Sequence, residues 1–524
     1  MTDAPAMHAA PARRDWILLA MLSAVPLLAE LAGLLSKDYG YFIDEFYYIA
    51  CAKRLAFGYV DHPPLAPLLL AGTRLVLGDA LWAIRLTAFL ALSATVWATG
   101  LLVWRLGGGR FATMLAGLTV GLSPVLLAMS SFYSMNAFEP LLWMLIVLAV
   151  VHIIQTGRSR MWLVVGALTG LAFQSKHTVI VYLAALGAGV LATRTRRVLL
   201  DRWLWAGAAV AAVIAVPNIV WQFANGWPSL EFYRKAHLLK NVPATPLASL
   251  AAQVLVNSPV AAPVWAAGLF YLLVHRDARH LRFLGMGFLV LLAMHVASQT
   301  SRADRTSAAY PALFAAGAIV IERALGRLRE RRPALARSAA VAVPAIVVLG
   351  ALIPAPAVLP ILSPSATAKY TSALGLTAQA ERGKSSPIPQ LLADRTGWES
   401  YVDDVERVYR SLPAADQAQV VFYAPSYGQA GSLELLGPAR GLPDRVIGAQ
   451  NTYWHWSVGR TNTDVLIAVD ANPATLRELF AQVWEAGRIR CDYCMSWRND
   501  IPIFVARRSI APIDSVWPRV RHYE

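Results

Sequence analysis

The chain has 524 residues, of which 57% are hydrophobic and only 15% are charged, and its formal net charge is +15. Because soluble globular proteins carry about a quarter charged residues, this composition excludes an ordinary soluble enzyme and indicates a polytopic membrane protein. The positive charge lies mostly in arginines that cluster between apolar runs, as in the cytoplasmic loops of membrane proteins. We therefore expect membrane lipids, and no nucleic acid, among its partners.

Apolar runs long enough to cross a bilayer recur along the first two thirds of the chain. The run at 16–35 is longer than the apolar region of a secretory signal and is followed by many others, so we interpret it as a retained span. The pattern predicts a mainly α-helical protein with about eleven transmembrane helices. Their expected limits are 16–35, 82–104, 111–130, 137–155, 161–177, 178–193, 203–222, 251–274, 281–299, 308–323 and 338–361.

Arginine clusters at alternate inter-span loops predict the topology. They comprise Arg13 and Arg14; Arg105 and Arg110; Arg158 and Arg160; Arg194, Arg196, Arg197 and Arg202; Arg276, Arg279 and Arg282; and Arg327, Arg329, Arg331, Arg332 and Arg337. All of these sets fall on the cytoplasmic side if the N-terminus is cytoplasmic. An odd number of spans then places the tail outside. We expect a transmembrane domain at 1–361 and an outward-facing soluble domain at 362–524.

The tail has a different composition and predicts a small α/β or α+β domain. It combines a helical stretch near 398–411 with strand-like runs at 419–424 and 464–469, and a second helix is expected near 473–487. It also carries Cys491 and Cys494 as a single CxxC pair, which is weak evidence for zinc. A location outside the cytoplasm would permit a disulfide between them, and two unpaired thiols are the alternative.

The first outward segment is the most informative one. Asp44 and Glu45 follow the first span among aromatic residues, and a second pair, Asp61 and His62, lies nearby. The spacing predicts a helix from Asp44 to about Phe57, with Pro63 and Pro64 preventing its continuation. The apolar stretch 65–77 is too short to span and is expected to lie along the membrane interface. An isolated acidic pair usually marks a solvated loop, but this setting favours a site.

Further polar residues stand at other outward helix ends, where ionisable groups are costly and tend to be functional. They are Arg85, Asn136, Glu139, Lys176, His177 and Arg302. Each alone has an ordinary explanation, because a cation at a helix end often only extends toward water. Together, carboxylates and cations at one membrane depth suit a substrate with hydroxyls and a phosphate. A carboxylate can serve as general base, and cations can stabilise a departing phosphate.

Several stretches resemble a known family. They are YFIDEFYYIACAKRLAFGYVDHPPLAPLL at 41–69, SMNAFEPLLW at 134–143, QSKHTVIVY at 174–182, PNIVWQFANGWPSLEF at 217–232, AYPALFAAGA at 309–318, FYAPSYGQAGSLELLGP at 422–438 and NTYWHW at 451–456. In these stretches the chain resembles GT-C glycosyltransferases of the protein-O-mannosyltransferase and aminoarabinose-transferase type (glycosyltransferase family 39-like). The matches follow the family order across the membrane region.

The resemblance implies an integral membrane glycosyltransferase of the bacterial inner membrane, with a periplasmic tail. Such an enzyme moves a sugar from a polyprenyl-phosphate-linked donor to an envelope glycan, lipid or protein. It implies that Asp44 is the catalytic base with Glu45 as a supporting neighbour. A second polar site is expected from Asn136, Glu139, Asp61 and His62, and donor-phosphate contacts from Arg85, Lys176, His177 and Arg302.

The chain departs from the family pattern before the tenth span. Some relatives carry Gly-Lys-x-Tyr-Tyr there, whereas this chain has SRADR at 301–305, which keeps a cation at Arg302 and loses both tyrosines. The sugar and the acceptor stay open. The sequence establishes no cofactor. A divalent metal stays open because of the carboxylates and His62, but no metal-ligand set with recognisable spacing supports it.

A polytopic lipid or solute transporter or flippase is the main alternative, and a membrane scaffold with a sensing outer domain is another. The two halves of the chain show no repeat symmetry of the kind that many transporters have. The polar residues also gather at outer helix ends rather than at the membrane midplane. The aromatic run from Tyr453 to Trp456 fits either a sugar-binding surface or a packed core.

Overall fold

The structure is a computed structural model and describes residues 12–376 and 381–524. Its contacts divide the chain into two compact units. The helical unit contains the residues up to Leu35 together with Arg85–Val220 and Val242–Ile361; the mixed unit contains Ser36–Ile84, Trp221–Asn241 and Leu362–Glu524. The contacts thus group two earlier segments with the tail. The linear division at residue 361 that we expected stays a prediction.

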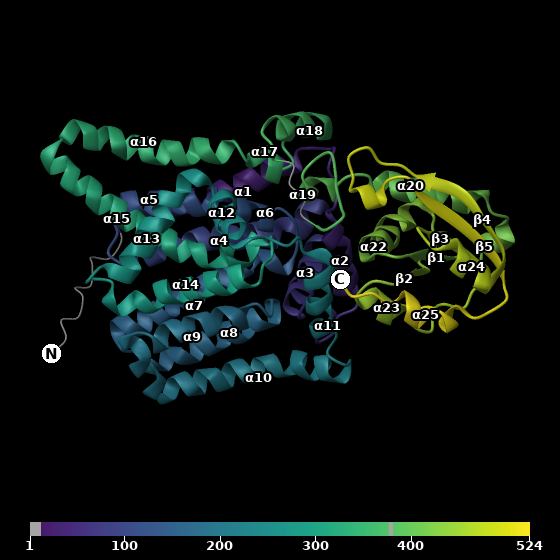
Figure 1. Ribbon diagram of the computed structural model, residues 1–524, viewed down its shortest axis with the longest axis horizontal. Helices are drawn as coiled ribbons and strands as arrows, with labels where there is room; N and C mark the ends of the chain where they lie inside the picture. Colours follow the sequence, from purple (N-terminus) through teal and green to yellow (C-terminus); the bar gives the residue numbers. More distant parts are fainter. Residues whose placement is uncertain (1–11, 377–380) are drawn as a thin grey trace. The chain divides into compact units, whose positions relative to one another are not determined.

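The helical unit is a bundle whose helices pack through small residues. Its helices are α1 (Arg13–Leu34), α4 (Leu81–Arg105), α5 (Arg110–Gly121), α6 (Pro124–Ser130), α7 (Glu139–Thr156), α8 (Trp162–Ser175), α9 (Val179–Leu191), α10 (Arg202–Ala224), α12 (Pro246–Val256), α13 (Ala262–Val274), α14 (Arg282–Ala297), α15 (Tyr310–Arg331), α16 (Pro333–Leu352) and α17 (Ala355–Val358). In Figure 1, α14 lies against α9, and α7 lies against α8.

Close backbone approach between α13 and α15 illustrates this packing. A Cβ on Gly268 of α13 would overlap the carbonyl oxygen of Leu313, and a Cβ on Gly317 of α15 would overlap that of Val264. Small residues at such crossings let transmembrane helices gain van der Waals contact, which is a main source of attraction where no hydrophobic effect acts between helices. Gly268 and Gly317 are therefore part of the core of this bundle.

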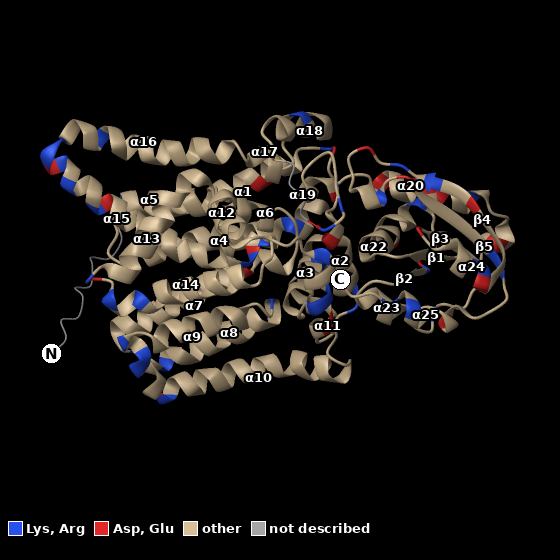
Figure 2. Ribbon diagram, in the orientation of Figure 1, with Lys and Arg blue, Asp and Glu red and all other residues tan. Residues whose placement is uncertain are grey.

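Seven helices of the described residues are long and apolar enough to cross a membrane, or up to ten if each of three bent pairs counts as one span. The expected span at 161–177 corresponds to α8, which has only 14 residues. The prediction of a mainly helical, multi-pass membrane protein is confirmed. Figure 2 shows the arginine-bearing loops between α9 and α10, between α13 and α14, and between α15 and α16 at one end of the helical unit.

The mixed unit combines helices with a five-stranded sheet. Its helices are α2 (Ile43–Lys53), α3 (Leu65–Leu77), α11 (Pro228–Lys235), α18 (Pro364–Ala373), α19 (Gln390–Ala393), α20 (Trp398–Ser411), α21 (Ala414–Gln417), α22 (Tyr427–Leu436), α23 (Thr452–Ser457), α24 (Pro473–Leu479) and α25 (Trp517–Val520). Its strands are β1 (Val421–Ala424), β2 (Val446–Gly448), β3 (Val465–Val469), β4 (Phe480–Ile489) and β5 (Ile501–Ser509).

The sheet has the order β2-β1-β3-β5-β4. Strand β1 pairs in parallel with β2 and β3, whereas β5 pairs antiparallel with β3 and β4. Helix α22 contacts β1 and β2. It begins at a capping box, in which the Ser426 hydroxyl accepts from Gln429 N and the Gln429 side chain accepts from Ser426 N. The small mixed domain expected in the tail is therefore present.

The helix expected near 473–487 is only half correct. Helix α24 ends at Leu479, and residues 480–489 form the edge strand β4. The antiparallel ladder from Phe480 to Ile489 along β5 supplies the hydrogen bonds that a helix would have made locally. Pairing with a strand that is distant in sequence therefore overrides the helical pattern.

Candidate active site

Asp44 lies in the first turn of α2, where the backbone sets its position. Phe42 is the N-cap residue, and its N–H donates a 2.7 Å hydrogen bond to Glu45 Oε2. The preceding backbone is fixed as well, because Ile43 N donates to the carbonyl oxygen of Asp394 at 3.1 Å. Carboxylates are favoured in a first helical turn, where the backbone N–H groups point toward them. In this structure the buried Glu45 caps the helix, while Asp44 stays partly exposed beside it.

The partner of Asp44 comes from the far end of the chain. Tyr427, the first residue of α22, donates a 2.7 Å hydrogen bond from its hydroxyl to Asp44 Oδ1. Two glycines of α22 permit this approach, since a Cβ on Gly428 would overlap the side chain of Ile43 and one on Gly431 would lie 2.8 Å from Phe46 Cβ. Burial raises the pKa of Asp44 above its ordinary value, and the Tyr427 hydrogen bond opposes that rise.

A second tyrosine links Asp61 to the same group. The hydroxyl of Tyr47 donates to Asp61 Oδ1 at 2.8 Å and lies 2.6 Å from Thr452 Oγ1. Its ring stacks on that of Tyr427, with centroids 4.9 Å apart and an angle of 29° between the planes. The structure therefore brings Asp44 and Asp61 into one network through a pair of stacked tyrosines.

His62 is packed inside this network. It is fully buried, its ring stacks on Tyr48 at 4.6 Å, and Nδ1 lies 3.0 Å from the carbonyl oxygen of Pro63. Nε2 lies 3.8 Å from Cys51 Sγ. Burial lowers the pKa of His62, so the imidazole is held neutral. These contacts give His62 a packing role against α2.

Further carboxylates and lysines surround Asp44 within the mixed unit. Glu381 pairs with Lys240 at 3.2 Å and with Lys384 at 2.8 Å. Burial opposes ionisation of Glu381, but the two lysines lower its pKa to about 2. Burial raises the pKa of Asp394 to about 6, against the attraction of Arg498. Lys240 and Glu381 both act electrostatically on Asp44, with opposite signs.

The other end of α2 is anchored to α22 by a buried carboxylate. Glu434, whose side chain is 3% exposed, accepts from Arg54 at 2.9 Å and from the hydroxyl of Tyr453 at 2.9 Å. Its pKa is lowered because Arg54 and its hydrogen bonds outweigh the cost of burial. Lys53 lies 3.5 Å away. Because α2 and α22 are joined at both ends, the Asp44 carboxylate and the Tyr427 hydroxyl are held in register.

A second polar cluster lies within the helical unit at the start of α7. Glu139 is 2% exposed, and its Oε2 accepts from Lys176 Nζ at 2.7 Å. The hydroxyl of Thr178 donates to the other carboxylate oxygen. A buried carboxylate with two donors is satisfied, whereas the loss of one partner would leave an uncompensated charge. Glu139 and Lys176, which were expected in two different sites, thus form a direct ion pair.

The other residues of the helical unit that the sequence suggested for the site each have different surroundings. His177 Nε2 donates to Asn218 Oδ1 at 2.9 Å. Arg302 pairs with Asp304 at 3.3 Å, just before the short helix Ala303–Ala309 that contacts α7. Arg85 is 2% exposed within α4. Asn136 lies in the single turn Met135–Ala137, and its N–H donates to the Ser134 hydroxyl at 3.2 Å.

Sequence reasoning missed several members of these clusters. In the mixed unit they are Tyr47, Lys240, Glu381, Tyr427 and Glu434, and in the helical unit Thr178. Their signal is weak because each partner lies far away in the chain. Among residues 12–376 and 381–524, no three His, Cys, Asp or Glu side chains gather as a metal site would require.

Comparison with solved structures identifies the fold. ArnT from Cupriavidus metallidurans in the apo state matches with a TM-score of 0.60 at 16% identity, over 94% of this chain and 98% of that chain. The same protein bound to undecaprenyl phosphate matches with a TM-score of 0.57 at 17% identity, again over 94% and 98%. The chain therefore has the GT-C glycosyltransferase fold, and the predicted resemblance is confirmed at the level of the fold.

A sequence comparison adds a family match for part of the chain. Residues 61–221 match the dolichyl-phosphate-mannose-protein mannosyltransferase family. A comparison with curated protein sequences found no match. The matched stretch includes Asp61, His62, Glu139 and Lys176 and begins after Asp44.

Proposed function

We propose that this protein is an integral membrane glycosyltransferase that moves a sugar from a polyprenyl-phosphate-linked donor to an envelope glycan, lipid or protein. The observation that carries the proposal is the partly exposed Asp44, held by Tyr427 at the first turn of α2 in a chain with the GT-C fold. ArnT, which shares the fold, has been solved with undecaprenyl phosphate. For this chain, that lipid is part of the proposal.

In the proposed reaction, Asp44 is the general base. Its carboxylate takes the proton from an acceptor hydroxyl, the resulting oxygen attacks the anomeric carbon of the sugar, and the bond from that carbon to the phosphate oxygen breaks. The polyprenyl phosphate leaves with an added negative charge. The raised pKa of Asp44, caused by burial, suits this role because it makes the carboxylate a stronger base than an exposed aspartate.

The leaving phosphate requires positive charge, and Lys176 and Arg302 are the proposed source. Preorganised cations in a site of low dielectric stabilise charge that develops in the transition state. Glu139 would orient Lys176 through their 2.7 Å ion pair. Arg302, with its side chain 37% exposed, has the greater freedom to meet a ligand. Apolar helices of the helical unit would accommodate the polyprenyl chain.

A transfer assay with purified protein tests the proposal. Protein in detergent is incubated with polyprenyl-phosphate-linked sugars and an envelope extract, and mass spectrometry follows sugar on the acceptor. Asp44→Asn should abolish transfer without changing expression or folding, because the amide cannot accept the proton. Asp444→Asn, an exposed change in the same unit, is the matched control. Near-normal transfer by Asp44→Asn would overturn the role of Asp44.

A second experiment addresses the substrates and the rival class. Lipids and glycans from cells with and without the protein are compared by mass spectrometry, and a sugar missing from one acceptor would identify both substrates. The protein is also reconstituted into vesicles with a labelled polyprenyl-phosphate sugar. Movement of the intact labelled lipid across the bilayer, without sugar transfer in any extract, would replace the proposed transferase with a flippase.

A further inference from the structure

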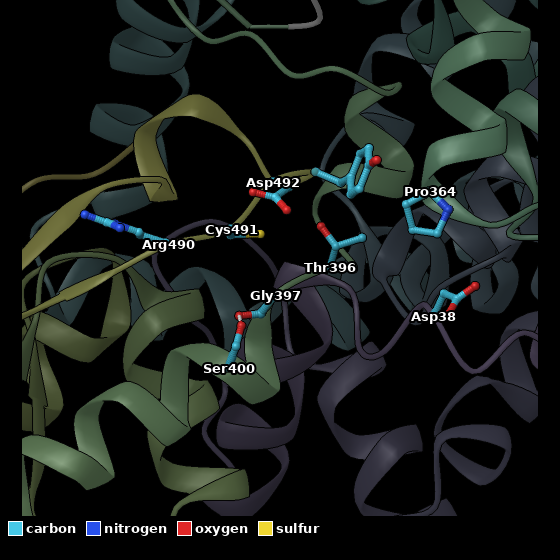
Figure 3. Close-up of a pocket in the computed structure, with 9 residues that line it drawn as sticks. Asp38, Pro364, Thr396, Gly397, Ser400, Arg490, Cys491 and Asp492 are labelled. Carbon is cyan, nitrogen blue, oxygen red and sulfur yellow. Dashed lines mark hydrogen bonds between the residues drawn. The ribbon is translucent and has the colours of Figure 1, made fainter.

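The loop between β4 and β5 places two cysteines beside a cavity of about 480 Å³ in the mixed unit. Cys491 lines this cavity together with Gly397, Ser400 and Asp492, as Figure 3 shows. Cys491 and Cys494 are both free thiols. The loop is fixed at its start because Cys491 N donates to Asn499 Oδ1 at 2.9 Å.

The two thiols differ in accessibility. Cys491 is partly exposed, whereas Cys494 is 3% exposed and donates from Sγ to the carbonyl oxygen of Cys491 at 3.2 Å. The sulfur of Cys491 lies over Gly397, where an added Cβ would overlap it. Gly397 has φ +76, a conformation that favours glycine. The floor of the cavity therefore has room for the Cys491 sulfur because no side chain occupies that point.

The surroundings of Cys491 favour its thiolate. The neighbouring Cys494 thiol and the charge of Arg498 lower the pKa of Cys491, against the effect of burial. Arg498 is buried and fixed, because it donates to the carbonyl oxygens of Thr396 at 3.1 Å and Ala393 at 2.7 Å. A thiolate is the reactive form of cysteine toward disulfides. An accessible thiol with a second thiol beside it suits two-step exchange through a mixed disulfide.

We propose that Cys491 and Cys494 form a thiol–disulfide exchange site, with Cys491 as the attacking thiol and Cys494 as the resolving thiol. The Cys491 thiolate attacks an external disulfide, forms a mixed disulfide and releases one external thiolate. Cys494 then loses its proton and attacks Cys491 Sγ, which forms the Cys491–Cys494 disulfide and releases the second external thiolate. The external disulfide gains the two electrons that the protein gives up. The cavity receives the external group, and the proposal does not depend on sugar transfer.

The full-length protein is reduced, freed of reductant in detergent and mixed with oxidised glutathione, and its modification is followed by mass spectrometry of the intact chain and its peptides. Wild type should end with two hydrogens lost and no bound glutathione. Cys494→Ser should accumulate glutathione on Cys491, because no resolving thiol remains. Cys491→Ser should gain glutathione on Cys494 at least about tenfold more slowly at pH 7, since Cys494 is buried and its thiol is protonated.

The design carries its own controls. Cys51, which is fully buried, should stay unmodified in every sample and so reports that the protein is folded. Serine keeps a hydroxyl of similar size at each position, which limits the structural change. Two outcomes would overturn the assignment of the two roles. One is glutathione that stays bound to the wild-type protein. The other is an equal rate of glutathione addition in Cys491→Ser and in Cys494→Ser. No reaction at either position, with Cys51 also protected, would overturn the site itself.

Discussion

The hydroxyl of Tyr427 donates a 2.7 Å hydrogen bond to the carboxylate of Asp44, although 383 residues separate the two in the chain. The bond favours the ionised carboxylate, while burial disfavours it. Tyr427 therefore acts on the basicity of Asp44 and on its position, and several expectations follow from this arrangement and from the two charged clusters.

Tyr427→Phe should shift the acid limb of the pH profile of kcat/KM to higher pH. Asp44 must be ionised to act as a base, and the loss of a hydrogen bond to its ionised form raises its pKa further above the ordinary value. A charge-assisted hydrogen bond contributes about 1.5 to 3 kcal/mol, so a shift of about one pH unit or more is expected. Tyr401→Phe, at another fully buried tyrosine of the same unit, is the control. An unmoved acid limb in Tyr427→Phe would contradict this role.

Gly431→Ala should destabilise the protein and lower transfer activity. The added Cβ would lie 2.8 Å from Phe46 Cβ and 3.1 Å from its backbone, so α22 must move away from α2. Overpacking of this kind costs about 1 to 3 kcal/mol. Gly72→Ala in α3 is the matched control, because nothing lies within 4 Å of a Cβ there and the helix gains about 1 kcal/mol from alanine. The melting temperature should fall in Gly431→Ala and rise in Gly72→Ala. Equal changes in the two variants would argue against tight packing at Gly431.

Glu139→Gln should be more damaging than the removal of both charges of its ion pair. The single change leaves the Lys176 ammonium buried without its carboxylate, which costs about 3 to 5 kcal/mol. Glu139→Gln combined with Lys176→Met removes both charges and should recover part of that loss. Thermal unfolding of the two single variants and the double variant completes a double-mutant cycle. A loss in the double variant equal to the sum of the two single-variant losses would show that the pair is not coupled.

Lys176→Ala should weaken binding of the donor more than binding of the acceptor. A charged hydrogen bond to phosphate is worth about 1.5 to 3 kcal/mol, which corresponds to a loss of donor affinity of about ten- to a hundredfold. The measurement is binding of the isolated polyprenyl-phosphate sugar to detergent-solubilised protein. Arg329→Ala, at an exposed arginine of the same unit, should leave donor affinity unchanged. Equal donor affinity in Lys176→Ala and wild type would remove Lys176 from the donor site.

In Glu381→Gln, the melting temperature should fall less steeply than in the wild type as the pH is lowered. The folded-state pKa of Glu381 is about 2, below its ordinary value of 4.5, so its ionised form stabilises the protein above pH 4.5 and that contribution is lost as the pH falls toward 2. The difference between these two pKa values corresponds to about 3 kcal/mol. Melting temperatures of wild type and Glu381→Gln should therefore converge as the pH falls through this window. Glu478→Gln, half exposed, is the control, and parallel curves for wild type and Glu381→Gln would contradict the prediction.

The sequence predicted the features that rest on local pattern. Long apolar runs predicted the membrane helices, and the spacing from Asp44 predicted a helix there, but it was expected to reach about Phe57 and α2 ends at Lys53. Helix α20 also followed its pattern, since Trp398, Tyr401, Val405 and Val408 recur at helical spacing and are buried. By contrast, β4 was expected as helix because its partner β5 leaves no trace in the local spacing.

The site was predictable only in part, because its members come from segments that are distant in sequence. Asp44 stood out because it is acidic among aromatics beside a span, but nothing in the family-like stretch 422–438 marked Tyr427 as its partner. Besides that resemblance, the spacing of Gly428 and Gly431 is a local signal, because it permits two helices to approach closely. Glu45 shows the opposite case. Its position three residues after Phe42 was compatible with two roles, helix capping and membership of the site, and in the structure it caps the helix.

The mixed unit is assembled from three separated stretches of chain, 36–84, 221–241 and 362–524. During synthesis, the helix that carries Asp44 leaves the ribosome several hundred residues before α22 does, and it has neither Tyr427 nor Glu434 until the tail is complete. A chain that ends before α22 therefore lacks both contacts that hold α2. In the proposed enzyme, the site around Asp44 would be completed only after α22 has been synthesised.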